Sequence, residues 1–281
     1  MGEQEQEALA ALRWLVEAGA DEALADEAVD RYAVPPVQAR QAALASQAPV
    51  PMREERPPLV SPPVWSPPAT PPAAPQELLE DARRLAAEAH SLQELHANIA
   101  AFEGCSLKKS ATNTVIFRGN PDSKIMLIGE APGRDEDLQG KPFVGAAGRL
   151  LDSMLSWAGL APTEVFITNL LFWRPPGNRT PETREIALCL PFIERQIALL
   201  QPEYLLLIGN VSTKTLLARQ EGITRLRGRW FPYHQPELKA PVPAMVMLHP
   251  AYLLRQPVQK RHAWRDMLAF QETVKQQKVP I

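Results

Sequence analysis

Short apolar segments alternate with segments of helical spacing through the second half of the chain. Four of them are continuously apolar, at 125–128, 165–168, 204–208 and 245–248. Strands that alternate with helices usually pair in parallel and are covered on both faces, which makes them apolar throughout. The pattern therefore predicts an α/β fold around a central parallel sheet of four strands.

Apolar residues at helical spacing predict the elements between these strands. We expect helices around 150–155, from Pro181 to Leu200, over 211–217 and around 264–270. Further upstream, Ser91 and Glu94 have the spacing of a capping box, which predicts the start of another helix.

A proline-rich segment divides the chain. Most of the unusual proline lies in 49–75, as doublets repeated every four or five residues. Because proline fixes φ and lacks an N–H, we expect an extended, disordered linker there. The chain then has three parts: a helical appendage at 1–48, the linker at 49–75 and a globular domain at 76–281. The linker is interpreted as a spacer or as a ligand for a proline-binding partner, and the appendage as a solvated or a partner-binding piece.

Composition narrows the functional class. Hydrophobic residues make up 45% of the 281 residues, charged residues 22%, and the net charge is −2. These values argue against a disordered chain and a globally basic nucleic-acid coat protein. The two cysteines exclude a disulfide-rich scaffold. No apolar run reaches the roughly 18 residues of a membrane span, and the acidic N-terminus lacks a signal-peptide layout. We expect a soluble, cytoplasmic protein without membrane association.

Polar side chains follow the predicted strands at their carboxyl ends, where open α/β sheets bind ligands. Glu130 follows the first strand, Asn169 the second and His249 the fourth. The Asn169 carboxamide can donate and accept at once, so it can pair with the edge of a base. Phe143 either belongs to the core or stacks on a ligand ring. These residues predict a site for a planar, amide-like ligand.

The remaining local signals are less specific. The glycine-rich segment 140–148 matches no dinucleotide or triphosphate loop. The basic residues Arg255, Lys260 and Arg261 are interpreted either as a solvated helix face or as contacts to a phosphate backbone.

Three motifs together resemble those of family 4 uracil-DNA glycosylases, and the resemblance covers about 101–269. The motifs are Gly-Glu-Ala-Pro-Gly at 129–133 with Gly-Lys-Pro-Phe-Val-Gly at 140–145, Ile-Thr-Asn at 167–169 with Arg-Pro-Pro-Gly-Asn-Arg at 174–179, and His-Pro-Ala-Tyr-Leu-Leu at 249–254.

The resemblance implies a three-layer α/β/α sandwich with a central four-stranded parallel sheet. It also implies a DNA repair enzyme that hydrolyses the N-glycosidic bond of uracil in DNA and leaves an abasic site for base excision repair. In that case Asn169 would recognise the uracil edge and Phe143 would stack on its ring. His249 would donate a hydrogen bond to the departing uracil, whose negative charge grows as the bond breaks.

The resemblance further assigns residues around the base. Glu130, Ala131 and Pro132 would shape the loop that faces the sugar and the attacking water, and Gly133 would be a further substrate-binding residue. The group that positions this water stays open between Glu130, Glu136 and Asp137. At the DNA surface, Leu253, Leu254 and Arg255 would lie in the minor groove, with Lys260 and Arg261 as further DNA contacts.

The chain departs from the family at one place. Family 4 enzymes usually bind an iron–sulfur cluster through four cysteines, of which only Cys105 and Cys189 remain here. Phe102 and Trp173 stand at the other two positions, and two thiolates do not hold such a cluster. We therefore expect no cofactor, with the two cysteines still neighbours and the two aromatic residues filling the vacated volume.

Loss of the cluster leaves one alternative function. The chain would then be a catalytically weak DNA-binding or damage-sensing module that recruits partners through its N-terminal helices and linker. Intact Asn169, Phe143 and His249 favour the enzyme.

Overall fold

The computed structural model describes residues 76–277. The predicted appendage at 1–48 and linker at 49–75 lie outside the described residues. The elements, in chain order, are α3 (Gln76–Glu88), α4 (Leu92–Ala101), η1 (Ser106–Lys109), β1 (Phe117–Gly119), β2 (Ile125–Gly129), α5 (Arg134–Gln139), α6 (Ala146–Trp157), β3 (Phe166–Asn169), η2 (Pro176–Asn178), α7 (Thr183–Leu200), β4 (Tyr204–Ile208), α8 (Asn210–Leu217), α9 (Ile223–Leu226), β5 (Trp230–Tyr233), β6 (Val242–Met247), α10 (Pro250–Arg255), η3 (Pro257–Gln259) and α11 (Lys260–Gln276).

The four predicted strands form the parallel centre of the sheet, as β3-β2-β4-β6. Their register aligns Gly129 with Asn169, and Ile208 with Met247. The residues that follow the strands are therefore gathered at one edge. Beyond Asn169 the pairing continues irregularly, since the N–H groups of Leu170 and Leu171 donate to the carbonyls of Gly129 and Glu130.

The prediction of four strands is incomplete, because the sheet has six and is mixed. Strand β1 pairs antiparallel with β3, and β5 pairs antiparallel with β6. Both are edge strands whose sequences weaken the strand signal. Strand β1 has three residues and ends in Gly119, and β5 contains Pro232, which an edge strand tolerates because one side of it is unpaired.

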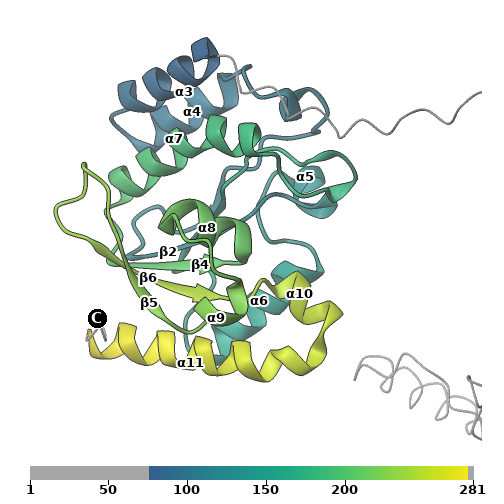
Figure 1. Ribbon diagram of the computed structural model, residues 1–281, viewed down its shortest axis with the longest axis vertical. Helices are drawn as coiled ribbons and strands as arrows, with labels where there is room; N and C mark the ends of the chain where they lie inside the picture. The colour runs from purple at the N-terminus through teal and green to yellow at the C-terminus, as the bar shows by residue number, and fades with distance from the viewer. Residues whose placement is uncertain (1–75, 278–281) are drawn as a thin grey trace, which may run out of the picture. The chain divides into compact units, whose positions relative to one another are not determined.

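Alternate residues of the central strands face different helical layers, which confirms the three-layer α/β/α arrangement. Met126 and Ile128 of β2 pack into the core under α3, α4 and α7, whereas Ile125 and Leu127 pack into the core with α6, α10 and α11. Figure 1 shows the sheet between these two groups of helices. Because both faces are covered, every residue of β2 and β4 is buried.

The capping box predicted from Ser91 and Glu94 is present at the start of α4. The Ser91 hydroxyl accepts a hydrogen bond from the Glu94 N–H at 3.1 Å, and the Glu94 carboxylate accepts from the His90 N–H at 2.8 Å. These bonds satisfy backbone donors that a helix start leaves free. Among the described residues, none of the helices combines the length and apolarity needed to cross a membrane.

Candidate active site

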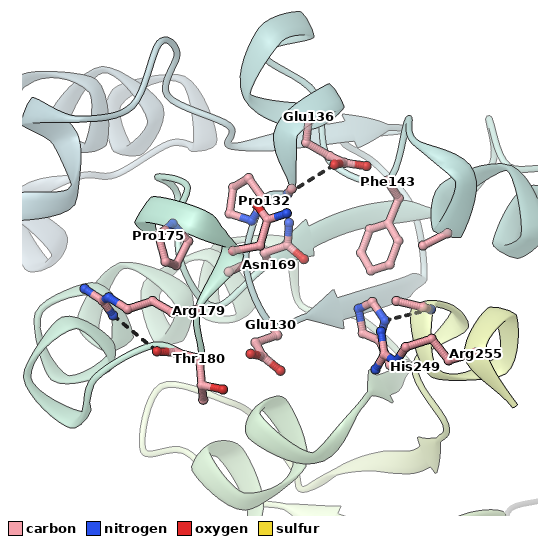
Figure 2. A pocket seen from close by; sticks show the side chains of 15 residues that line it. Glu130, Pro132, Glu136, Phe143, Asn169, Pro175, Arg179, Thr180, His249 and Arg255 are labelled. Carbon is pink, nitrogen blue, oxygen red and sulfur yellow. Dashed lines mark hydrogen bonds between the residues drawn. The ribbon is translucent and has the colours of Figure 1, made fainter. Parts of the chain in front are cut away.

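A pocket of about 450 Å³ opens at the carboxyl ends of β2, β3 and β6. Open α/β sheets bind ligands at this edge, next to the point where the strand order reverses. Here that point is β2, which has β3 on one side and β4 on the other. Figure 2 shows Phe143 and His249 on one side of the pocket, Arg179 on the other and Asn169 between them. The lining residues are Glu130, Ala131, Pro132, Gly133, Glu136, Phe143, Ala147, Asn169, Pro175, Asn178, Arg179, Thr180, His249, Ala251 and Arg255.

Asn169 brings an unsatisfied polar atom to the pocket. The residue is 2% exposed, and its Oδ1 is buried without a hydrogen-bond partner among residues 76–277. Leaving such an acceptor unpaired costs about 1–3 kcal/mol, so a ligand that donates to it recovers that cost. Gly129 makes the approach possible, because a Cβ there would lie 2.3 Å from this Oδ1 and 2.5 Å from the Phe143 ring.

Phe143 is buried with an unusual backbone. Its φ is +54°, a left-handed conformation that a bulky residue adopts only when its surroundings hold it there. The ring lies 5.7 Å from the His249 ring, with an angle of 27° between their planes. A flat, apolar wall thus lies beside the amide of Asn169, which suits a planar base.

His249 follows β6 and is held as a neutral imidazole. Its Nδ1 accepts a hydrogen bond from the Ala251 N–H at 3.1 Å, so the ring proton is on Nε2. Burial, together with the positive charge of Arg255, lowers the pKa of His249 to about 4. The ring therefore offers an N–H donor without a positive charge at neutral pH.

Three carboxylates were candidates to position a water, and their surroundings differ. Glu130 lines the pocket, its carboxylate makes no hydrogen bond to another described residue, and burial raises its pKa. Glu136 accepts from the N–H groups of Gly133, Val144 and Gly145 at 2.8–3.1 Å. Asp137 is buried and accepts from two backbone N–H groups of the loop before β1. Glu136 and Asp137 thus hold loops, whereas Glu130 is available to a ligand.

The loop before α7 forms the opposite wall. Arg179 pairs with both oxygens of the buried Glu185, at 2.6 and 2.9 Å, and Glu185 also accepts from the Glu182 N–H at 2.8 Å. Burial is the largest single influence and works against ionisation of Glu185. The bonds from Arg179 and from the Glu182 N–H, together with the nearby positive charges, outweigh it and lower the pKa of Glu185. The Glu185 carboxylate therefore anchors Arg179, and the loop that carries Arg179 lines the pocket.

The predicted DNA-facing residues divide by exposure. Leu253 is fully buried in the core beside α6 and α11, so its expected role in the minor groove is wrong. Helix α10 is amphipathic, and this side chain lies on its inner face. Leu254 is 42% exposed, and Arg255, Lys260 and Arg261 are exposed on α10 and at the start of α11.

The region of the missing cysteines is a hydrophobic cluster. Cys105 and Cys189 are buried, and the Cys105 side chain together with burial raises the pKa of Cys189. Phe102 and Trp173 are among the largest fully buried side chains and belong to the same core. Two cysteines among aromatic rings do not fit a cluster that needs four thiolates.

The rings in this region form a continuous chain. Phe102 lies 5.3 Å from Phe192, Phe192 lies 6.3 Å from Phe172, and Phe172 lies 5.9 Å from Trp173, as distances between ring centroids. The Trp173 Nε1 donates to the Thr114 hydroxyl at 3.0 Å. Aromatic rings therefore occupy the region of the missing cysteines, and the indole N–H of Trp173 has a hydrogen-bond acceptor.

Sequence reasoning missed several functional positions. Ala147 and Thr180 line the pocket without a signal in their residue type. Arg118, from an element distant in the sequence, contacts the Phe143 loop and pairs with Asp152 of α6. Only the pairing of edge strand β1 with β3 brings Arg118 near, and that strand was not predicted.

Comparisons with known proteins agree with this geometry. Residues 116–268 match the family model described as the Uracil DNA glycosylase superfamily. A type-4 uracil-DNA glycosylase of Pyrobaculum aerophilum is 38% identical over 183 residues, covering 64% of this chain and 92% of that protein. One from Sulfurisphaera tokodaii is 36% identical over 65% of this chain and 84% of that protein, and one from Archaeoglobus fulgidus is 37% identical over 59% and 85%. The chain belongs to the uracil DNA glycosylase superfamily, as a family 4-like member.

Proposed function

We propose that this chain is a DNA repair glycosylase that hydrolyses the N-glycosidic bond of uracil in DNA and leaves an abasic site. The observation that carries the proposal is the buried, unpaired Oδ1 of Asn169 in a pocket walled by the Phe143 ring. A flipped uracil presents an N–H donor at N3 and flat faces for stacking, so it matches both features.

Asn169 recognises the edge of the base. Its Oδ1 accepts from uracil N3–H, and its amide group donates to the O4 carbonyl. Cytosine carries an amino group and an unprotonated N3 at these positions. Its amino donor would face the amide donor of Asn169, and its N3 acceptor would face the Oδ1 acceptor. Thymine has the uracil edge but an added methyl group, which meets the wall formed by Phe143 and the 129–131 turn. The pocket thus selects uracil by its pattern of hydrogen-bond donors and acceptors and by its size.

His249 stabilises the leaving group. As the glycosidic bond breaks, negative charge develops on the uracil ring and its O2 carbonyl. A neutral Nε2–H donor, already in position, stabilises that charge without first losing its own proton. Support comes from the Nδ1 bond to Ala251, which keeps the proton on Nε2.

Glu130 positions the attacking water. It is the candidate carboxylate that lines the pocket without being used by backbone N–H groups, and its raised pKa makes it a better proton acceptor. Glu136 instead joins the turn at Gly133 to the loop at Val144 and Gly145. If bond rupture runs ahead of water attack, Glu130 assists the reaction without being essential.

Exposed residues on α10 and at the start of α11 bind the DNA strand. Arg255, Lys260 and Arg261 contact phosphates, and Leu254 fills the space that the flipped nucleotide leaves. The proposed reaction uses no cofactor. A cytoplasmic location and a protein partner for residues 1–75 stay predictions from the sequence.

Single substitutions in the pocket test this assignment. Asn169→Ala and His249→Ala are expected to lower single-turnover excision of uracil by about 10²-fold or more, while affinity for DNA stays close to that of the wild type. His234→Ala is the matched control, because His234 is exposed on the chain after β5, outside the pocket lining. Excision at the wild-type rate by both pocket variants would overturn the assignment, and loss of activity in the control would question the assay.

A further inference from the structure

The loop that carries Phe143 is held from its far side by a residue outside the pocket. Arg118, on edge strand β1, donates from Nε to the Pro142 carbonyl at 2.8 Å and from Nη2 to the Phe143 carbonyl at 3.2 Å. The same Nη2 pairs with Asp152 of α6 at 2.5 Å. The Arg118 side chain is 15% exposed, so its charge is largely shielded from water and these bonds are well protected.

The backbone at Phe143 needs such support. Its φ of +54° is unfavourable for a residue with a large side chain, and nothing in the phenylalanine itself stabilises it. Helix α6 also approaches closely, since a Cβ on Gly148 would lie 1.8 Å from the Phe143 carbonyl oxygen. A loop in this conformation persists only where several contacts fix it.

The carbonyl groups of the loop are bound by a positive side chain, and its N–H groups are bound by a negative one. The carbonyls of Pro142 and Phe143 accept from the Arg118 guanidinium, and the N–H groups of Val144 and Gly145 donate to the Glu136 carboxylate. Three successive peptide groups, from Pro142 to Gly145, are thereby fixed, and the one between Phe143 and Val144 is held at both its carbonyl and its N–H. The ring orientation depends most on Arg118, because the side chain leaves the backbone at the Cα between the two carbonyls that Arg118 binds.

We propose that Arg118 is a positioning residue for base recognition, which holds the Phe143 ring at the stacking distance from uracil through the carbonyls of Pro142 and Phe143. Asp152 fixes the guanidinium in turn. The inference rests on the proposed function of Phe143 as the stacking wall. It assigns Arg118 no contact with DNA or base.

Arg118→Lys tests the inference, because lysine keeps the charge but cannot bond two carbonyls and a carboxylate in the plane of a guanidinium. We expect single-turnover excision of uracil to fall about 10- to 100-fold, because a shifted Phe143 ring would hold the base away from its reactive position. The inhibition constant for free uracil should rise about tenfold, since the base itself is bound less well. The dissociation constant for uracil-containing DNA should stay within about twofold, because phosphate contacts dominate it.

The chain offers a matched control. Arg195 is also half-buried, donates twice to the carbonyl of Ala89 at 2.7 and 2.9 Å, and pairs with Glu237 at 2.6 Å, away from the pocket. Arg195→Lys should lower the melting temperature by a similar amount with excision and uracil inhibition unchanged. Asp152→Asn, which leaves both carbonyl bonds available, should weaken uracil binding in the same direction by a smaller factor.

The outcomes separate the inference from the function on which it rests. If Phe143→Ala leaves excision and uracil inhibition unchanged, the stacking role itself fails. If Phe143→Ala impairs both while Arg118→Lys does no more than Arg195→Lys, the positioning role is overturned. The inference stands if Arg118→Lys weakens inhibition by uracil beyond the control at equal melting temperature.

Discussion

At the scale of single residues, the side chains proposed to act on uracil lie at or near the ends of strands. The positions of Asn169 and His249 could be predicted, because a polar residue at the carboxyl end of a buried parallel strand lies at the ligand edge of the sheet. The use of Glu136 could not, because its three N–H partners are brought to it by two turns. Leu253 misled the prediction because only the packed helix shows which of two adjacent leucines points inward.

Gly129 gives a prediction about space. Gly129→Ala should lower uracil excision by about 10²-fold, since its methyl group would displace both Asn169 Oδ1 and the Phe143 ring. Gly159→Ala serves as a control, because a methyl group there meets nothing within 4 Å, although its positive φ makes the change mildly destabilising. Single-turnover rates for both variants, with melting temperatures, measure the effect. Equal activity of the two variants would contradict the tight packing of the pocket.

The pH profile of excision separates His249 from Glu130. His249 stays neutral down to a pKa of about 4, so kcat/KM should show no step near pH 6.5 from this residue. Burial raises the pKa of Glu130, so activity should fall on acidification at a pH above the ordinary carboxyl value, as the carboxylate takes up a proton. Glu130→Gln should remove this acid limb and lower the rate by no more than about 10²-fold. A step at pH 6.5 that His249→Gln abolishes would contradict the neutral donor.

At the scale of elements, the segments after α4, after β3 and within α7 meet in one apolar cluster. The sequence predicted this meeting from the positions of Phe102, Trp173 and the two cysteines, and their burial in one core confirms it. The aromatic chain itself needs Phe172 and Phe192, which spacing alone did not single out. The cluster lies outside the pocket lining, so it supports stability first.

Trp173→Ala measures that support. Removing a fully buried ring should cost about 3–5 kcal/mol in the free energy of unfolding, from urea denaturation. Trp157→Ala is the control, because Trp157 is 73% exposed and should change stability by no more than about 0.5 kcal/mol. Uracil excision per folded molecule should be retained in both. A cost below that of the control would refute the packed cluster.

The same cluster predicts the metal content. Protein purified without oxygen should be colourless, with neither iron nor acid-labile sulfide, because two buried thiols and two aromatic rings replace four thiolates. Elemental analysis and the visible absorption spectrum measure this. Iron at several equivalents per chain would contradict the account of the cysteine region.

At the scale of the whole molecule, the alternation of apolar strands and helices could predict the parallel centre and its two helical covers. It could not predict β1 and β5, because edge strands are short and are partly stabilised by their single neighbour. That omission hid Arg118, whose place beside the pocket follows from the pairing of β1. The errors are thus concentrated at the rim of the sheet, and the buried strands carried the correct signal.

Stability should depend on pH through two partly buried histidines, His96 and His249. Burial lowers the pKa values of His96 and His249 to about 4, while both would titrate near 6.5 in the unfolded chain. The unfolded state therefore binds more protons between these values, and each histidine makes the free energy of unfolding fall by up to about 1.4 kcal/mol per pH unit on acidification. His96→Gln should reduce this dependence between pH 6.5 and 5, whereas the exposed His90→Gln should not. Identical slopes in wild type and His96→Gln would contradict the prediction.

The most direct test of the central claim is release of uracil by the purified chain. DNA with one uracil at a defined position, single-stranded and double-stranded, is incubated with the protein, and free base and alkali-labile sites are counted. The account predicts uracil and abasic sites in equal amounts, and no base released when thymine occupies the same position. A folded, DNA-binding protein that releases no uracil from either substrate, or that releases thymine equally well, would contradict it.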